Sequence, residues 1–447
     1  MKNYLLKNVV CVNEGQCTET DVLIRNGVFE KIASHIPEPK YAVDVIDGKG
    51  KHLLPGLIDD QVHFREPGLT HKATIATESK AAIAGGITSF FEMPNTNPQT
   101  TTLEKLEEKF AVAAQTSYAN YSFMFGGTNT NLEDIKRLKI DQAAALKLFL
   151  GSSTGNMLVD DEDVLRSIFS STPLVIATHC EDEATVRKNL SEHINTYGDD
   201  IPIEKHPVIR SEAACYRSSS NAVRLAKETG ARLHVFHVST AKELELFDNS
   251  IPLGQKKITA EVCTHHLWFS DQDYAVKGTL IKWNPAVKTK NDRDALVAGV
   301  MNDALDILAT DHAPHTLQEK AQVYTKAPSG GPLVQHALPA LLQLYHQGKF
   351  TLEKIVEKAC HNPAILFDID RRGYIREGYY ADAVLVDLNA SWKVSETPIW
   401  YKCGWSPFEG TTFDSTVTQT FVNGHLAYTN GNFSQEKHAH RIAFNRE

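Results

Sequence analysis

Eight short apolar segments alternate with helix-forming segments between residues 53 and 311, and this alternation limits the folds that the chain can adopt. The segments read LLPGLI, ITSFFEM, NYSFMFGG, AAALKLFLG, LVIATH, RLHVFHV, KITAEV and DALDILATD. Strands that alternate with helices are typical of an α/β protein with a parallel sheet. Eight such units predict a (β/α)8 barrel of the TIM type, which places its chemistry at the carboxyl ends of the strands.

Both ends of the chain carry hairpin signals of a different kind. VLIRNGVFEKI turns on Asn26 and Gly27, and TFVNGHLAYTNG turns on Asn423 and Gly424. Asn-Gly is favoured in type I′ turns, and GYYADAVLVDL (378–388) alternates like a strand. We therefore expect residues 1–52 and 376–447 to build one small β-sandwich domain beside a barrel of residues 53–375. The alternative is a pair of unrelated edge hairpins.

Composition excludes several classes of partner and location. The chain has 447 residues, 42% of them hydrophobic, and a formal net charge of -9, which argues against nucleic acid or an anionic membrane as a partner. No apolar run is long enough to span a bilayer, and the first residues have too short an apolar core for a signal peptide. Seven scattered cysteines without a Cys-x-x-Cys pair fit a reducing compartment. We expect a cytoplasmic protein.

Polar residues follow directly on the first of the eight strands. The stretch from Pro55 to Gly68 reads PGLIDDQVHFREPG, which an ordinary core strand would not carry. Side chains alternate across a strand, so Gln61, His63 and Arg65 are expected to share one face. That face presents a metal ligand beside a fixed cation.

Three later strands also end in residues that carry chemistry. His179 in THCED ends the fifth strand, His237 in FHVST ends the sixth, and Asp311 in ATDHAPH ends the eighth. A lone histidine is more often a core or surface residue, but two at the ends of consecutive strands favour a shared site. Imidazole is a common zinc ligand, and a catalytic zinc site keeps one position open for water. Asp311 could instead cap the next helix.

Lys147 lies inside the fourth strand, in AAALKLFLG. A lysine in such a place could extend its charged end to solvent, because lysine is rarely buried without a partner. A buried lysine with a lowered pKa can instead act as a neutral amine. The sequence leaves both interpretations open.

The order of these motifs resembles that of the dihydroorotases in the amidohydrolase superfamily. The motifs are HFREPG, MPN, the lysine of the fourth strand, HCED, HVST, NP and TDHAPH, and the resemblance covers nearly the whole chain. The chain departs from the family at Gln61, where the family has the first histidine of a His-x-His pair. It also has PAVK after Asn284, where an arginine is usual, and Ser329 in place of a phenylalanine.

The resemblance implies a role for each of these residues. One zinc ion would be held by His179, His237 and a bridging, carboxylated Lys147, and a second by His63 and Asp311. In many bacterial members an aspartate of the following loop takes the place of the bridging lysine. Asp311 would also move the proton between water and the leaving nitrogen. Gln61 stands at a further ligand position, where its neutral amide oxygen is a weaker zinc donor than imidazole, so one or two ions per chain are expected.

The resemblance further implies a substrate and a set of residues that bind it. The implied reaction is the interconversion of dihydroorotate and N-carbamoyl-aspartate, with substrate contacts from Arg65, Asn95, Asn284, His315, Ser329 and Gly330. The loop that runs from His315 through KAPSGGPL is expected to close over the substrate. A homodimer is also implied.

Three alternatives stay open beside an active enzyme with two ions. The first is an active enzyme with one firm ion. The second is a catalytically silent homologue that binds and organises aspartate transcarbamoylase. The third is another cyclic amidase, an allantoinase or a hydantoinase. Arg65 favours a ring that bears a carboxylate, because a planar guanidinium pairs with a carboxylate through two hydrogen bonds.

Overall fold

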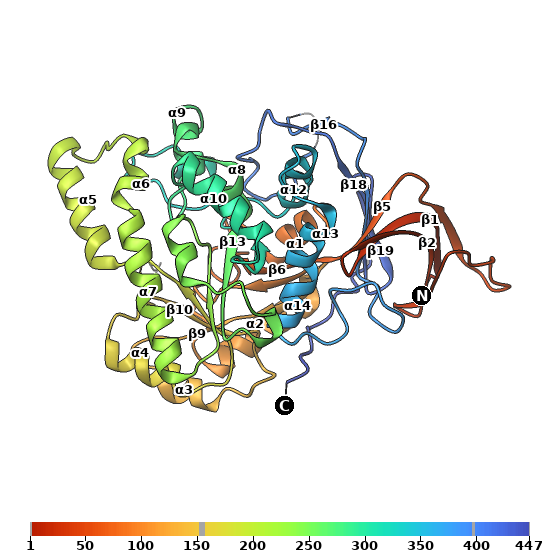
Figure 1. The fold of residues 1–447 in the computed structure, drawn as a ribbon, viewed down its shortest axis with the longest axis horizontal. Helices are drawn as coiled ribbons and strands as arrows, with labels where there is room; N and C mark the ends of the chain where they lie inside the picture. The colour runs from red at the N-terminus through yellow and green to blue at the C-terminus, as the bar shows by residue number, and fades with distance from the viewer. Residues whose placement is uncertain (1, 152–156, 396–397, 447) are drawn as a thin grey trace.

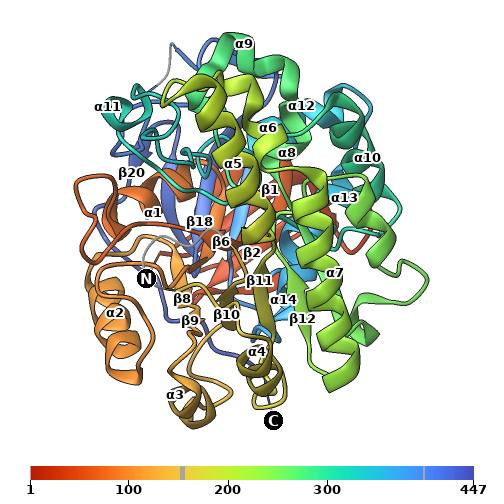
Figure 2. The same cartoon turned by 90° about the vertical axis from the view of Figure 1, so that its left-hand side faces the viewer.

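The eight predicted strands form a parallel barrel in the computed structural model, which describes residues 2–151, 157–395 and 398–446. The barrel strands are β6 (Leu57–Val62), β7 (Ile87–Glu92), β8 (Asn120–Phe123) with its continuation β9 (Phe125–Gly126), β10 (Leu146–Phe149), β11 (Ile176–His179), β12 (Leu233–Val235), β13 (Ile258–Cys263) and β14 (Ile307–Ala309). The prediction of a (β/α)8 barrel is confirmed. Figure 1 shows the barrel and its helices on the left, and Figure 2 shows α4, α5 and α7 on the outside of the strands.

The barrel closes at two places. One lies within the third strand, and the other lies between the first and the last strands. β6, β7 and β8 pair with one another, and β9 to β14 form the second set of paired strands. At Met124 the third strand changes partner, since the Met124 N–H donates to Glu92 O and the Phe125 N–H donates to Ala145 O. At the other joint, the His63 N–H donates to His312 O at 2.7 Å. The second joint places the backbone of His63, a predicted site residue, within the sheet's own hydrogen bonding.

Helices cover the outside of the barrel. The longer ones are α1 (Ile75–Ala84), α2 (Leu103–Thr116), α3 (Leu132–Arg137), α4 (Glu162–Phe169), α5 (Glu183–Tyr197), α7 (Glu212–Thr229), α10 (Lys290–Met301) and α12 (Ala337–His346). The shorter ones are α6 (His206–Ile209), α8 (Thr264–Trp268), α9 (Tyr274–Lys277), α11 (Leu317–Lys320), α13 (Leu352–Val356) and α14 (Asn362–Leu366). Side-chain caps start many of them, as where Thr74 accepts from the Thr77 N–H. No helix of the described ranges is long and apolar enough to cross a membrane.

A nine-stranded sheet beside the barrel is built from both ends of the chain. Its order is β20-β19-β18-β15-β5-β1-β2-β3, and β4 pairs with β1. The strands are β1 (Tyr4–Asn13), β2 (Gln16–Arg25), β3 (Val28–Ala33), β4 (Asp44–Asp47), β5 (His52–Pro55), β15 (Ala383–Asp387), β18 (Thr416–Val422), β19 (His425–Thr429) and β20 (Asn432–Phe433). A separate ribbon pairs β16 (Trp392–Lys393) with β17 (Thr412–Phe413). The expectation of one β domain made by both termini is confirmed, while the exact domain boundaries stay a prediction.

The two predicted hairpins turn as their sequences indicate. Asn26 and Gly27 have φ values of 52° and 83°, and Asn423 and Gly424 have φ values of 49° and 76°. A type I′ turn needs positive φ at both central residues, and Asn-Gly supplies it at low cost.

A buried polar cluster around Asp382 joins the sheet to the barrel. The Asp382 carboxylate pairs with Arg372, and both side chains are 3% exposed. The carboxylate also accepts from Asn120 Nδ2 of β8 at 3.1 Å and from the Asn423 N–H at 2.7 Å. Buried charges are stable only when they are paired and hydrogen-bonded, so this cluster fixes one geometry between the two parts.

We expect Asp382→Ala to lower the free energy of unfolding by about 3–5 kcal/mol, because it leaves the Arg372 charge buried without its carboxylate. Urea denaturation followed by circular dichroism measures the change. The matched control is Glu133→Ala, which removes an exposed carboxylate from its pair with Lys136 and should change stability little. Equal, small effects of the two variants would contradict the structural role of Asp382.

Candidate functional site

One cavity at the carboxyl ends of the barrel strands brings together every site residue that the sequence predicts. These residues are Gln61, His63, Arg65, Asn95, Lys147, His179, His237, Asn284, Asp311, His315, Ser329 and Gly330. Phe149, Trp283 and Ala313 complete the lining. The roles assigned to them stay predictions, and their geometry shows what each can do.

Unusual backbone conformations turn three of these side chains into the cavity. Arg65, His237 and Asp311 have φ values of 67°, 39° and 49°, and each lies two or three residues beyond the end of its strand. A residue other than glycine pays about 1–3 kcal/mol in such a conformation, and this strain is typical of functional sites. A further irregularity lies in β6, whose pairing with β7 shifts register between Asp59 and Val62. Gln61, His63 and Arg65 nevertheless line the same cavity, as the alternation of this strand predicts.

His179 and His237 face each other across the cavity floor. His179 Nδ1 lies 2.9 Å from His237 Nε2, and His179 Nε2 lies 3.0 Å from the carboxylate of Glu181. Burial alone raises the pKa of Glu181, but Arg210 and His179 outweigh it and hold that pKa at about 2. An ionised carboxylate only accepts, so the proton of His179 sits on Nε2 and its Nδ1 lone pair points at His237.

His63 forms the second converging pair with Asp311. Its Nδ1 lies 2.9 Å from Asn95 Oδ1, and its Nε2 lies 3.3 Å from Asp311 Oδ1. Because an amide oxygen only accepts, the Nδ1–H donates to Asn95 and the Nε2 lone pair is left toward Asp311. Burial, with Arg65 and Lys147 nearby, lowers the pKa of His63 well below its usual value. The ring is therefore neutral and offers the lone pair of its Nε2.

The Asp311 carboxyl is 5% exposed and sits among other acids. Burial raises its pKa well above the usual value, and Glu261 raises it further, whereas Lys147 and Arg65 act in the opposite direction. A raised pKa makes this carboxyl a stronger base, and a carboxyl in hydrogen-bond reach of a reacting water can both accept and return a proton.

Lys147 is buried and points into the cavity. Its side chain is 1% exposed, and its Nζ lies 4.1 Å from the centroid of the Phe236 ring. No described residue gives this nitrogen a hydrogen-bond partner. Burial lowers its pKa to about 7, so much of the amine is neutral at physiological pH. The described aspartates that follow the strand, Asp160 and Asp161, are exposed, which favours the lysine over an aspartate as the group at this position.

Arg65 and His315 form the other side of the cavity. Arg65 donates through Nε to Pro314 O at 3.2 Å, and its Nη2 lies 3.1 Å from His315 Nε2. Lys72 Nζ lies 3.0 Å from His315 Nδ1, and His315 Nε2 lies 3.0 Å from Ser329 O. Burial lowers the pKa of Arg65 to about 10, which leaves the guanidinium charged at neutral pH. A fixed cation thus lines the cavity together with the His179–His237 and His63–Asp311 pairs.

The comparisons with known proteins agree on the family. The model described as "Amidohydrolase family" matches residues 52–427. The chain belongs to the amidohydrolase family. The dihydroorotase of Carboxydothermus hydrogenoformans is 34% identical over 432 residues, which are 94% of this chain and 96% of the relative. The dihydroorotase of Methanosphaera stadtmanae is 30% identical over 432 residues, 95% of this chain and 96% of the relative.

Solved structures with the same fold belong to hydantoinases and dihydropyrimidinases. The L-hydantoinase (dihydropyrimidinase) of Arthrobacter aurescens superposes with a TM-score of 0.92 at 26% identity, over 99% of this chain and 100% of its own. The dihydropyrimidinase of Brevibacillus agri superposes with a TM-score of 0.89 at 23% identity, over all of both chains. The second likeness establishes the barrel and the adjoining β domain only.

Two groups of three ligand atoms lie within 4.8 Å of one another in the described part of this amidohydrolase, and neither contains the zinc ligands expected from the sequence. One group is Asp60, His234 and Glu261 inside the barrel, and the other is His425, Glu436 and His438. The expected ligands form two separate pairs instead, with Lys147 as a further buried donor. His265 and His266 are also buried, with His265 stacked on Trp283 at 4.4 Å.

The loop expected to close over the substrate is held in place by two buried lysines. Lys320 Nζ donates to Lys282 O, Pro328 O and Gly330 O at 3.2, 2.9 and 2.8 Å. Lys282 Nζ donates to Tyr324 O and Ala327 O, both at 2.6 Å, and the Gly330 N–H donates to Lys282 O. Ser329 and Gly330 therefore reach the cavity in a fixed arrangement.

Sequence reasoning missed several residues that support the site. Glu181 orients His179, Trp283 and Phe149 line the cavity, and Lys320 holds the loop. Glu181 could have been suspected in HCED, because a metal-ligand histidine usually donates its other ring N–H to a carboxylate, a carbonyl or water. The contacts of Lys320 and Trp283 join distant segments, and no local pattern marks them.

We expect Lys320→Met to release the segment 328–330, because it removes three hydrogen bonds to backbone carbonyls. One hydrogen bond contributes about 0.5–1.5 kcal/mol, and the loss of three corresponds to roughly tenfold faster amide exchange or more. Hydrogen exchange at Gly330 measures the effect. The matched control is Lys326→Met, an exposed lysine of the same loop, which should leave the exchange rate unchanged. Similar exchange in both variants would show that Lys320 does not hold the loop.

Proposed function

We propose that this amidohydrolase is a dihydroorotase, which interconverts (S)-dihydroorotate and N-carbamoyl-L-aspartate, a step of pyrimidine synthesis, by metal-dependent hydrolysis of the cyclic amide. The observation that carries the proposal is the pairing of two chemistries in one cavity. Two imidazole-containing pairs, one of them completed by the Asp311 carboxyl, line the same cavity as the Arg65 guanidinium. A ring that bears both an amide and a carboxylate matches this arrangement.

The donor set fits zinc. Imidazole, carboxylate and a modified lysine are all suitable zinc ligands, and His237 Nδ1 and Lys147 Nζ are buried without a hydrogen-bond partner among the described residues. His179, His237 and Lys147 would hold one ion, and His63 and Asp311 a second, with Gln61 near the latter. Bound zinc would polarise the amide carbonyl and make water a stronger nucleophile.

The chain's own residues account for proton transfer and binding. Asp311 would take a proton from the attacking water and return it to the ring nitrogen as the amide bond breaks, a role that its raised pKa supports. Arg65 would pair with the ring carboxylate. Asn284 Oδ1 is buried without a hydrogen-bond partner among the described residues and would accept from a ring N–H.

Lys147 would enter the site as a carbamate. A neutral amine attacks carbon dioxide and releases one proton to solvent, which converts the amine into an anionic carbamate. The pKa of about 7 supplies the neutral amine that this addition needs.

Two alternatives are tested by the same experiment. A silent partner of aspartate transcarbamoylase would have no chemical need for the buried Lys147 or for the His179–His237 and His63–Asp311 pairs. A hydantoinase or an allantoinase would have no ring carboxylate to pair with Arg65. The experiment is turnover of dihydroorotate, hydantoin and allantoin by the purified, zinc-supplemented protein, with bound zinc counted on the same sample. Turnover of dihydroorotate alone supports the proposal, and its absence in zinc-loaded protein overturns it.

A homodimer and an association with aspartate transcarbamoylase remain predictions of the family resemblance. Analytical ultracentrifugation of the protein alone tests the first, and the same measurement with added aspartate transcarbamoylase tests the second.

We expect Asp311→Asn to reduce turnover of dihydroorotate by about 10³-fold, because an amide cannot accept and return the proton. The near-isosteric change should leave the unfolding midpoint within a few degrees of the wild type. The matched control is Asp160→Asn, which alters an exposed aspartate in the segment between β10 and α4 and should retain activity. Full activity of Asp311→Asn would refute the proton-transfer role, and loss of activity in Asp160→Asn would favour an aspartate of that loop over Lys147.

We expect Gln61→His to raise the affinity for the second zinc ion at least tenfold, because imidazole is the better donor. Gln61 is 1% exposed in the cavity lining, so the new ring would face the same space. Zinc per chain, measured across a series of buffered free zinc concentrations, gives the affinity. The control Gln322→His places a new imidazole on the exposed loop surface. Identical zinc binding in Gln61→His and the wild type would place Gln61 outside the metal site.

A further inference from the structure

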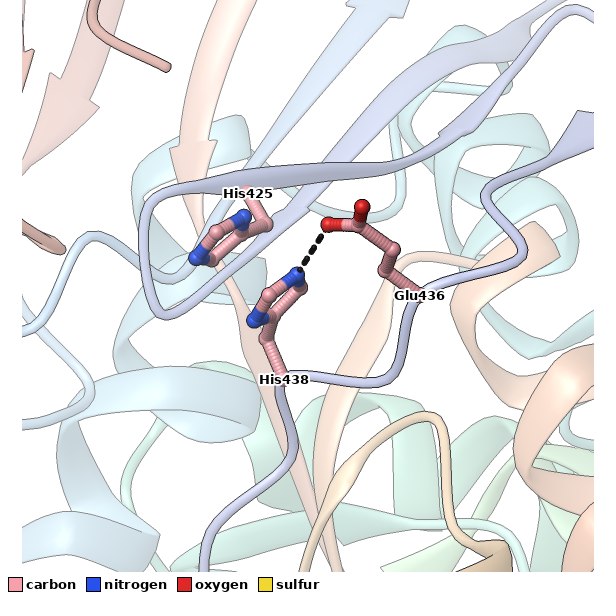
Figure 3. Close-up of side chains that lie close together, drawn as sticks. All are labelled: His425, Glu436 and His438. Atoms are coloured by element: carbon pink, nitrogen blue, oxygen red, sulfur yellow. Dashed lines mark hydrogen bonds and ion pairs between the residues drawn. The ribbon is translucent and has the colours of Figure 1, made fainter. Parts of the chain in front are cut away.

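Three potential metal ligands lie together on the β domain, far along the chain from the barrel cavity's residues. His425 begins β19, and Glu436 and His438 lie on the C-terminal segment that follows β20. Figure 3 shows the two imidazole rings stacked with Glu436 beside them. One ligand atom of each residue lies within 4.8 Å of those of the other two.

The two histidines are held unusually close. Their ring centroids are 3.1 Å apart and the rings are parallel within 3°. His438 Nε2 pairs with Glu436 Oε2 at 3.0 Å, which orients the second ring toward the carboxylate. Two rings at this separation gain little from dispersion, which is best near 3.5–4.0 Å between carbon atoms.

His425 carries an unsatisfied nitrogen. Its Nε2 is buried and has no hydrogen-bond partner among the described residues. A buried polar atom without a partner costs about 1–3 kcal/mol, and a metal ion would satisfy it.

We propose that His425, Glu436 and His438 form a second, separate site for a divalent transition-metal ion of the zinc class. Two imidazoles and a carboxylate suit zinc, nickel and copper and do not suit the hard ions calcium and magnesium, which prefer oxygen. Three protein ligands leave a coordination position for water or another group. The half-exposed setting of both histidines leaves the site open to metal from solution.

The position of the site gives it a structural consequence. The C-terminal segment continues past His438 onto the barrel, where the Tyr121 N–H donates to His440 O and the Ile442 N–H donates to Tyr121 O. Arg446 ends the described chain with hydrogen bonds to carbonyls on the barrel, including Ala143 O at 2.9 Å. A metal ion bound to β19 and to this segment would tie together the sheet and the segment that spans to the barrel.

The test counts zinc on the full-length protein. Wild type, His425→Gln, His438→Gln and Glu436→Gln are dialysed against the same buffered free zinc, with turnover of dihydroorotate measured on each. We expect each variant to lose one zinc equivalent per chain and to keep its catalytic rate, because none of the three residues lines the barrel cavity. The matched control is His35→Gln, a histidine of the same domain whose side chain is 75% exposed, which should keep every equivalent.

A second measurement guards against variants that misfold. In the wild type, added zinc should slow amide exchange in residues 434–440 at least tenfold, and in Glu436→Gln, whose changed side chain is exposed, it should not. Unchanged zinc stoichiometry in all three variants would overturn the proposal. So would equal protection of residues 434–440 in the wild type and in Glu436→Gln. Neither result depends on whether the barrel is a dihydroorotase, since zinc binding and exchange are read without substrate.

Discussion

Desolvation is the constraint on which the barrel cavity depends. The ionisable groups at the strand ends are almost fully buried, with Lys147 at 1%, His237 at 2% and Asp311 at 5% exposure. Burial pushes each pKa toward the neutral form, down for lysine and histidine and up for aspartate. The result is a set of neutral nitrogen donors beside a carboxyl that is a stronger base than usual. A divalent cation is the partner that such a set lacks, so the electrostatics of the fold and the metal chemistry of the family point the same way.

The scaffold holds this costly arrangement through backbone hydrogen bonds. Left-handed residues at strand ends and the bulge in β6 aim the side chains, and the adjoining strands pair in regular parallel register. On the substrate side, Lys320 and Lys282 bind the carbonyls of the loop and leave it little freedom. The cavity is therefore preorganised on both sides, which reduces the reorganisation that a reaction would require.

The sequence was sufficient for the fold and for the membership of the cavity, but not for its geometry. Strand number and the two Asn-Gly turns follow from short-range periodicity and turn chemistry, which residues near each other in the chain decide. The change of partner at Met124, the bulge near Gln61 and the left-handed turn at His237 depend on how neighbouring strands pair. Glu181 and Lys320 act on groups that the fold alone brings to them, so a local pattern carries little trace of their roles.

The names of the relatives suggest two kinds of ring substrate, and the charge on Arg65 distinguishes between them. A TM-score of 0.92 with a hydantoinase reports the path of the backbone, which many activities share. Identity of 34% with a dihydroorotase reports side chains over nearly the full length of both proteins. The side chain that discriminates is Arg65, whose charge is buried in the cavity wall at 5% exposure. A buried cation facing a cavity is costly without an anion, and a ring carboxylate supplies that anion where an uncharged hydantoin ring would not.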